Sequence, residues 1–397
     1  MPRPNPGTDK DLVVVVHNIA WSTYKAVVFS RLNFHLNERG YRFLVADIAD
    51  TERQRRGMEG AGPGDRQYPH QVLCPGVWED YSSLHRSIAV GKLLISTRPV
   101  LVVLSGYFDW SFWTGLLVAR LLGCRVITAV DSTEADRPRT SRLKEAAKSW
   151  FLRLSDAAFV YGSRARNYCI KLGMPADKIF VRCQAADNER VSVACEVARK
   201  EIPATRPKAF IFVGRVSDEK NIWRLLEAFR RLTLDPSYSR SPWHLYIVGA
   251  GPQLDDCREW VEREQLGSVS FAGGVPAAEV PGYFAKSDVL VLPSLSEPWG
   301  LVVNEAMACG LAAIVSDKCG CAPDLISAGD NGIIVDPLDD DALLSAMLHF
   351  VRDEPVAARM GEASKKRIEQ FTPDVAALSM CHGVEFALRK RGSVGDA

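Results

Sequence analysis

The chain has 397 residues, 47% of them hydrophobic, and its 49 basic and 48 acidic side chains leave a net charge of +1. This length predicts two or three domains with sizeable cores, and the near-neutral charge gives no support for a nucleic-acid partner. The ten cysteines lack paired metal-ligand spacing, and no run resembles a secretion signal or a membrane span, so we expect a metal-free cytoplasmic protein.

The first half of the chain alternates short apolar runs with helical patterns. The runs at residues 12–16 and 100–106 are almost continuously apolar, which is typical of strands buried on both faces of a parallel sheet. Helical periodicity lies between such runs, for example over residues 24–39. This alternation predicts an α/β domain with a doubly wound parallel sheet over residues 1–190.

Polar and aromatic residues follow two apolar runs of the first half, residues 12–16 and 124–130. They lie at the expected strand ends, where open α/β sheets bind ligands. Sugars stack on aromatic faces and hydrogen-bond to short polar groups, although Trp21 and Tyr24 could instead pack the first helix. Asp131 could orient a sugar hydroxyl or assist proton transfer, or else Asp131 or Ser132 caps the next helix. The candidate acceptor-binding residues are His17, Trp21, Ser22, Tyr24, Lys25 and Asp131.

Two charged segments interrupt the alternation. Residues 137–154 are basic and contain Trp150 and Phe151. They either lie on an anionic membrane surface or form a solvated helix whose aromatic residues enter the core. Residues 191–207 are dense in charge and end near two prolines, so we expect them to link the first domain to a second one over residues 208–370.

The second domain opens with an apolar run at residues 209–213, followed by GRVSDEKN. An arginine fork and a lysine point charge beside a helix start form a good cradle for a diphosphate, whereas pairing with Asp218 and Glu219 is the alternative. The turns after the next two strands contain glycines that allow either close approach of a nucleotide or a tight turn. The residues concerned are Gly214, Arg215, Lys220, Gly249, Gly251, Gly274 and Val275.

A further strand, residues 289–292, leads through a loop containing Glu297 into a helix that begins near Gly300. The first amides of that helix suit an anionic ligand. Glu305, just over one turn into the helix, is expected beside Glu297, and both carboxylates could accept hydrogen bonds from sugar hydroxyls. The alternative is a solvated loop acid and an ordinary helix acid.

Two segments carry a family resemblance. SEPWGLVVNEAMACG resembles the E-x7-E element of retaining GT-B glycosyltransferases of family four, and GRVSDEKN resembles their G-R-x-x-x-x-K-N element. The resemblance implies two Rossmann-like domains facing across a cleft, with the helix in residues 371–397 crossing back to the first domain. It also implies a UDP- or GDP-sugar as co-substrate and no permanently bound cofactor or metal.

The expected activity is transfer of a sugar, with retention, to a glycan, a lipid-linked acceptor or a small molecule. The resemblance implies catalytic roles for Arg215, Lys220 and Glu297. Alternatives are a nucleotide-sugar epimerase and a non-catalytic regulatory protein that binds sugar nucleotides, with peripheral contact at the inner membrane face through residues 137–154 left open. The expected donor-binding residues are Gly214, Gly249, Gly251, Gly274, Val275, Trp299, Gly300, Leu301, Val302 and Glu305.

Overall fold

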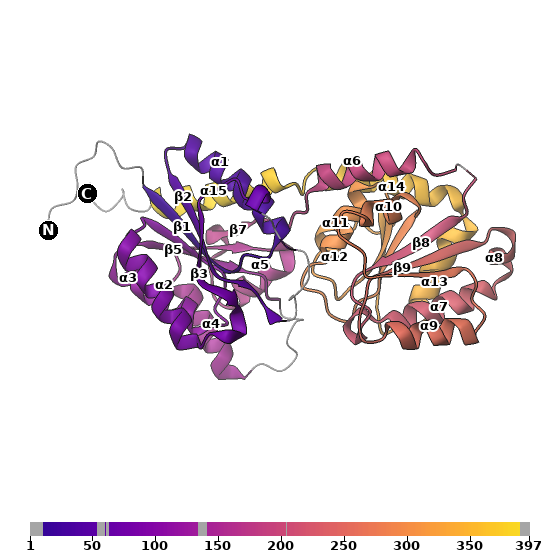
Figure 1. Cartoon of the computed structure of the whole chain (residues 1–397), viewed down its shortest axis with the longest axis horizontal. Coiled ribbons are helices and arrows are strands. Elements are labelled where there is room, and N and C mark those ends of the chain that lie inside the picture. Colours follow the sequence, from indigo (N-terminus) through magenta and orange to yellow (C-terminus); the bar gives the residue numbers. More distant parts are fainter. Residues whose placement is uncertain (1–10, 54–59, 61–62, 134–140, 204, 390–397) are drawn as a thin grey trace. The chain divides into compact units, whose positions relative to one another are not determined.

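The computed structural model describes residues 11–53, 60, 63–133, 141–203 and 205–389. It divides into two compact units (Figure 1). Unit 1 comprises Met1–Cys183 and Pro373–Ala397, and unit 2 comprises Gln184–Thr372. Each unit is built on one parallel sheet, which confirms the predicted α/β class.

Unit 1 contains a sheet of seven strands in the order β3-β2-β1-β4-β5-β6-β7, all parallel. Its central strands are buried on both faces, as their apolar sequences predict. The order reverses between β1 and β4, which creates a topological switch point at the carboxyl edge. The strands are β1 (Leu12–Ile19), β2 (Arg42–Thr51), β3 (His70–Val77), β4 (Leu101–Leu104), β5 (Arg125–Val130), β6 (Ala157–Val160) and β7 (Ile179–Val181).

Helices cover both faces of this sheet (Figure 1). Alternate residues of β1 point to opposite faces: Val14 and Val16 pack in the core beneath α2 and α3, whereas the His17 ring meets Phe29 of α1 edge-on at 5.6 Å. The helices of unit 1 are α1 (Thr23–Glu38), α2 (Ser83–Thr97), α3 (Trp110–Leu121), α4 (Arg142–Arg153), α5 (Gly162–Lys171) and α15 (Pro373–Arg389).

The last helix of the chain, α15, packs against α1 and against strands β5, β6 and β7. His35 of α1 pairs with Asp374 at 2.8 Å, and Arg39 pairs with Glu385 at 3.1 Å. A Cβ added at Gly383 would lie 2.4 Å from the Phe159 ring, so this helix approaches the sheet closely. The final helix therefore completes the core of unit 1.

Unit 2 contains six parallel strands in the order β10-β9-β8-β11-β12-β13, with the reversal between β8 and β11. Helices α6, α10, α11 and α14 lie on one side of the sheet and α7, α8, α9 and α13 on the other (Figure 1). The strands are β8 (Lys208–Val213), β9 (Trp243–Val248), β10 (Val269–Gly273), β11 (Val289–Leu292), β12 (Ala312–Ser316) and β13 (Gly332–Val335). The helices are α6 (Asn188–Arg199), α7 (Ile222–Thr233), α8 (Pro236–Arg240), α9 (Leu254–Arg263), α10 (Val280–Ala285), α11 (Leu301–Ala308), α12 (Ala322–Leu325), α13 (Asp340–Arg352) and α14 (Glu354–Ile368).

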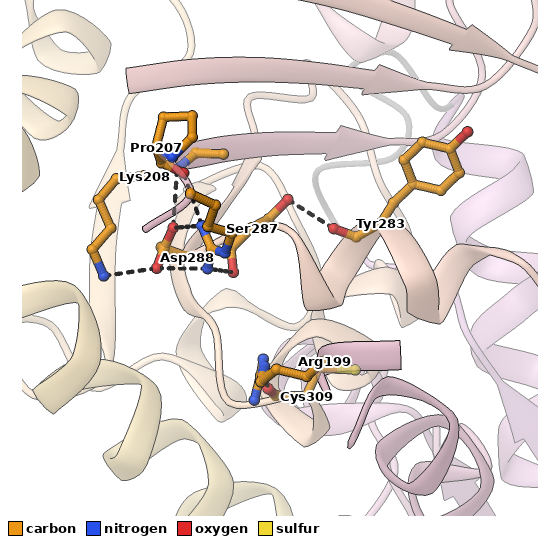
Figure 2. Close-up of polar contacts among 9 residues, drawn as sticks. Arg199, Pro207, Lys208, Tyr283, Ser287, Asp288 and Cys309 are labelled. Carbon is orange, nitrogen blue, oxygen red and sulfur yellow. Dashed lines mark hydrogen bonds and ion pairs between the residues drawn. The ribbon is translucent and has the colours of Figure 1, made fainter. Parts of the chain in front are cut away.

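A charged cluster centred on Asp288 joins β8 to β11 at the amino edge of this sheet (Figure 2). Its carboxylate accepts hydrogen bonds from Arg206 at 2.7 and 3.1 Å, from Lys208 at 3.0 Å and from the Ala209 amide at 3.0 Å. Two cations thus share one half-buried carboxylate, and the cluster holds the two central strands together.

The prediction of a linker over residues 191–207 is wrong for the first half of that range, because Asn188–Arg199 forms helix α6 of unit 2. The Asp187 side chain caps this helix by accepting from the Arg190 amide at 3.3 Å. Cys195 is fully buried, and Arg199 donates to the Cys309 carbonyl at 2.9 Å (Figure 2). The charges that suggested a linker occupy the solvent face of an amphipathic helix.

In the basic segment with two aromatic residues, residues 137–154, the described part contains helix α4, Arg142–Arg153. Phe151 is fully buried, whereas Trp150 is 57% exposed, so only one of the two aromatic residues enters the core. None of the helices within the described residues combines the length and apolar character needed to span a bilayer. Peripheral membrane contact through this segment stays a prediction.

Candidate functional site

The loops that leave β8 and β11 start side by side at the carboxyl edge of the unit 2 sheet, where its strand order reverses. The Leu295 amide donates to the Glu219 carbonyl at 2.8 Å. The Asn221 side chain donates to the carbonyls of Pro293 at 3.2 Å and Pro337 at 3.1 Å. The bonds to Glu219 and Pro293 fix the two loops against each other, and the bond to Pro337 ties them to the loop after β13, at the place where open parallel sheets bind ligands.

Lys220 and Glu297 form an ion pair between these two loops. Their side chains are 18% and 16% exposed, so the pair is partly shielded from water, which strengthens its electrostatic attraction. Asp218, one of the two partners in the alternative interpretation, is instead hydrogen-bonded by the Gln253 side chain. Burial would raise the pKa of the other partner, Glu219, but hydrogen bonds and the charges of Arg215 and Lys220 lower it, so Glu219 still interacts electrostatically with both cations. The structure thus brings together two of the three residues predicted to be catalytic.

Arg215, the third predicted catalytic residue, is exposed on the loop after β8. Its guanidinium forms no ion pair or hydrogen bond with any residue in the described part of the chain. An arginine in this setting keeps all five of its N–H donors for a ligand or for solvent. Its place in a diphosphate cradle therefore stays a prediction that the loop position favours.

The loop after β11 is held rigidly where it enters α11. The Gly320 amide donates to the Glu297 carbonyl at 2.8 Å, and the Cys321 amide donates to the Trp299 carbonyl at 3.1 Å. Gly300 has a φ of 96°, the left-handed region that favours glycine, and no side chain caps the helix. The first amides of α11, at Leu301 and Val302, therefore carry the partial positive charge of a helix start.

Glu305 lies on the second turn of α11, and burial raises the pKa of its carboxyl to about 7. Its side chain forms no hydrogen bond or ion pair with any described residue. A carboxyl group that is half protonated near neutral pH can both donate to and accept from a hydroxyl group. The expected contact between Glu305 and a sugar ring stays a prediction.

Trp299 has a structural role that the sequence did not indicate. Its indole is 2% exposed and donates from Nε1 to the Asn304 side chain at 2.9 Å. Asn304, also fully buried, donates in turn to the Gln184 carbonyl at 3.1 Å. The Trp299 side chain is therefore part of the buried support of the loop, and donor binding by this residue, which would have to use its backbone, stays a prediction.

The predicted donor-binding glycines pack loop against loop. A Cβ on Gly249 would lie 1.8 Å from the Gly214 carbonyl oxygen, and one on Gly251 would lie 2.2 Å from the Val216 carbonyl oxygen. These glycines are therefore required for close contact between the loops after β8 and β9. Gly274 is exposed and Val275 half-buried in the turn after β10, so they leave backbone accessible at the same edge.

The acceptor candidates of unit 1 differ in how far the structure exposes their side chains. His17 lies within β1, which runs on to Ile19, and is 6% exposed. Its Nδ1 hydrogen-bonds to Asp47 at 3.0 Å, so its expected loop position is wrong: the buried strand is three residues longer than its apolar run. Ser22 is 8% exposed as the first residue before α1, while Trp21 and Tyr24 are half-buried.

Asp131 is exposed immediately after β5, with Ser132 donating to it at 3.5 Å. The next described helix, α4, is capped by Ser141, which accepts from the Lys144 amide at 3.3 Å. Asp131 and Ser132 therefore do not cap α4, and residues 134–140, between them and that helix, lie outside the described residues. Asp131 stays available at the carboxyl edge of the sheet.

Two charged or polar residues at this edge were missed by the sequence interpretation. Tyr161 directly follows β6, and Arg182 directly follows β7. The Tyr161 hydroxyl accepts hydrogen bonds from both Arg182 and Lys25. The signal that could have found them is the one applied to Asp131, namely a polar residue immediately after a buried strand.

Residues 196–367 match the family model of the Glycosyl transferases group 1. The matched segment contains both the Lys220–Glu297 pair and the start of α11. The predicted resemblance to glycosyltransferases is therefore confirmed for this segment.

The chain is 27% identical over 261 residues to the glycogen synthase of Mycobacterium tuberculosis (strain CDC 1551 / Oshkosh). This alignment covers 64% of the chain and 61% of that relative, so it spans about three fifths of the relative's length.

Solved structures resemble most of the chain. Sucrose-phosphate synthase of Thermosynechococcus elongatus aligns with a TM-score of 0.73 at 19% identity, covering 96% of this chain and 100% of the other. The Anabaena protein HepE in complex with UDP aligns with a TM-score of 0.74 at 15% identity, covering 94% and 99%. These likenesses confirm the predicted GT-B fold with two Rossmann-like domains.

Proposed function

We propose that the chain is a glycosyltransferase of family four that moves a sugar from a nucleoside-diphosphate sugar to a hydroxyl group of an acceptor, with retention at the anomeric carbon. The observation that carries the proposal is the Lys220–Glu297 ion pair at the switch point of unit 2. It lies within the segment that matches the Glycosyl transferases group 1. The fold and the names of two similar proteins, a glycogen synthase and a sucrose-phosphate synthase, support the same class of enzyme.

In the proposed chemistry, the protein's own positive charges stabilise the anionic leaving group. Lys220 and Arg215 offer N–H donors, and the first amides of α11 add the partial positive charge of a helix start. Such donors accelerate transfer when they stabilise the charge that develops on the departing diphosphate. We propose that these groups, rather than a metal ion, hold that charge.

Glu297 has a second role in this proposal. Its carboxylate is held beside Lys220, so it can accept hydrogen bonds from donor-sugar hydroxyls while the lysine contacts phosphate. Glu305 would accept a hydrogen bond from a ribose hydroxyl of the nucleotide. The acceptor hydroxyl would attack from the face that the diphosphate leaves, and the departing oxygen would take its proton.

The substrates that we propose are a UDP- or GDP-sugar and a glycan, lipid-linked or small-molecule acceptor. HepE was solved with UDP, which supports a nucleotide of this kind. Trp21, Tyr24 and Asp131 remain the acceptor candidates with accessible surface. His17 is buried in the sheet, so it would influence acceptor binding only by supporting the residues around it.

A donor panel tests the proposal. Purified full-length protein is incubated with individual sugar nucleotides, with and without a mixture of glycan acceptors, and release of nucleoside diphosphate is measured. Release that requires an acceptor, with an α-linked product from an α-linked donor by NMR, supports retaining transfer. Isomerised donor without release would indicate an epimerase, and binding without turnover would indicate a regulatory protein.

A further inference from the structure

Lys25, Tyr161 and Arg182 converge at the carboxyl edge of the unit 1 sheet from three different elements. Lys25 lies on the first turn of α1, Tyr161 follows β6 and Arg182 follows β7. The Lys25 nitrogen lies 4.1 Å from the centre of the Tyr161 ring, and the Arg182 guanidinium also lies 4.1 Å from it. Each residue is only 6% or 7% exposed, so two cations are buried on one tyrosine.

The positive charge of this cluster is not balanced by a contacting carboxylate. Neither Lys25 nor Arg182 forms an ion pair with any residue that the structure describes. Asp131 is the acid that acts electrostatically on Lys25, but it is exposed and is not in ion-pair contact with it. Burying charge without a partner is costly, so two such cations side by side need an explanation.

Most of the hydrogen-bond donors in the cluster are also unused. A lysine has three N–H donors and an arginine five. Lys25 donates to the Tyr161 hydroxyl, and Arg182 donates to that hydroxyl and, at 3.5 Å, to the Met380 sulfur. The Arg182 Nε is buried without a hydrogen-bond partner in the described structure. The cluster therefore has donors in excess of the acceptors that the fold supplies.

Two helices begin beside these cations. Helix α1 starts after Ser22 and α5 starts after Tyr161, and in neither case does the side chain of that residue cap the helix. Helix starts favour anions because their first amides lack internal acceptors. The partial charges of both helices thus have the same sign as Lys25 and Arg182.

We propose that this cluster, Lys25 with Tyr161 and Arg182, binds an anionic group of the acceptor, a phosphate or a carboxylate. The proposal rests on the glycosyltransferase function and names the class of its acceptor: a sugar or polyol that carries a negative charge. Tyr24, half-buried beside Lys25, offers an aromatic face on which the neutral part of such a molecule can stack.

Isothermal titration calorimetry of the full chain with glucose 6-phosphate, glucuronate and glucose tests the proposal. We expect at least one anionic probe to bind at least tenfold more tightly than glucose. Lys25→Met and Arg182→Met should each weaken binding of that anionic probe at least tenfold. Arg182→Lys should bind it more tightly than Arg182→Met does. A preference for one probe identifies the anion as phosphate or carboxylate.

Arg86→Met is the matched control, because Arg86 is an equally buried arginine of unit 1 that already has a carboxylate partner. It should leave probe binding unchanged at a temperature where the variant is folded. Equal binding of charged and neutral probes, no binding of any probe, or unchanged binding by Lys25→Met and Arg182→Met would each overturn the proposal.

The same preparations separate this inference from the proposed function. Binding of UDP and GDP is measured in parallel, with Lys220→Ala as the variant that should weaken it. Nucleotide binding that depends on Lys220, without any preference for anionic probes, would remove the acceptor inference alone. Anion binding that depends on Lys25, without any nucleotide binding, would remove the transferase proposal and leave the anion site standing.

Discussion

Two arginines of unit 1, Arg86 and Arg182, are each 7% exposed and each lie over an aromatic ring. Arg86 lies 4.3 Å from the Trp78 ring centre and donates to Asp109 at 2.7 Å, whereas Arg182 lies over Tyr161 and contacts no carboxylate in the described structure. Burial and ring contact are the same in both places. The difference is that only Arg86 has its charge neutralised by the fold.

This difference separates a structural ion pair from a binding site. Burial would raise the pKa of Asp109, but hydrogen bonds from Arg86 and Ser111 outweigh burial and lower it, so the pair is mutually stabilising. Unit 2 repeats the contrast: Asp288 neutralises Arg206 and Lys208 at the amino edge. At the carboxyl edge of unit 1, by contrast, Lys25 and Arg182 contact no carboxylate among the described residues, and ligands are expected at such an edge.

The largest effect should come from breaking the compensated pair. Arg86→Met leaves the Asp109 carboxylate without its cation, and removing one partner of a buried pair costs about 3–5 kcal/mol. Urea unfolding should therefore show a loss of about that size. If Arg182→Met destabilised the protein equally, the distinction between the two arginines would be lost.

The next effect concerns the carboxyl edge of unit 2. Lys220→Ala and Glu297→Ala should each reduce turnover at least ~100-fold, because one preorganised charge contact contributes about 3 kcal/mol to transition-state stabilisation. Lys208→Ala is the control, since Lys208 also pairs with a carboxylate but at the opposite end of β8. Steady-state rates with a saturating donor provide the measurement; near-normal turnover of both first variants would contradict the assignment.

Removing an uncompensated charge should stabilise the fold. Lys25→Met replaces a buried cation with an apolar side chain of similar length, and such replacements are neutral or stabilising by about 1 kcal/mol or more. Thermal unfolding at pH 7 should show a melting temperature equal to or above that of the parent. A clear loss of stability would mean that Tyr161 and Asp131 already compensate Lys25.

Titration of Lys25 should make anion binding depend on pH. Burial lowers the pKa of Lys25 to about 7, against a smaller opposing effect of Asp131. The groups that face it are Tyr24, Tyr161, Arg182 and Asp131. Sulfate affinity should fall several-fold from pH 6.5 to pH 8.5, because only protonated Lys25 attracts the anion and sulfate keeps its charge. A flat calorimetric profile would contradict this dependence.

The same titration has a stability counterpart. Because the folded-state pKa of Lys25 lies below its unfolded value, the unfolded chain binds more protons between pH 7 and pH 9, and this residue's contribution to stability rises with pH. Lys25→Met should lack that rise. The pH dependence of the urea midpoint, compared between parent and variant, checks the sign.

The last prediction concerns Glu305. Burial raises the pKa of its carboxyl to about 7, so the folded state binds the proton more tightly than the unfolded chain does. The contribution of Glu305 to stability is therefore full below about pH 4.5 and is lost as the pH rises to about 7. Glu305→Gln should match the parent near pH 4.5 and melt at a higher temperature at pH 8; equal melting temperatures at pH 8 would contradict the shift.

The sequence predicted those parts of the molecule that rest on local patterns. Continuous apolar runs predicted the buried strands, and the spacing of Glu297 from Glu305 predicted a loop and helix that place an acid at a strand end. The meeting of Lys220 with Glu297 followed from topology, because loops after adjacent parallel strands share an edge.

Other features depend on register and packing that spacing does not contain. His17 was expected in a loop because it is polar, yet Asp47 of the neighbouring strand satisfies it inside the sheet. Trp299 was expected to face a ligand, but Asn304 and the Gln184 carbonyl provide buried partners for its loop. Lys25 and Arg182, which both contact Tyr161, are 157 positions apart in the sequence, so no local signal could have shown that they meet there.

The return of α15 to unit 1 has a consequence for how the protein is made. The ribosome completes all of unit 2 before it synthesises Pro373–Arg389, the helix that covers β5, β6 and β7. The first unit to begin synthesis is therefore the last to be finished, and until then the apolar surface that receives Met380 and Val384 lacks its native cover. A nascent chain arrested before residue 373 should expose that surface to chaperones although its second unit is complete.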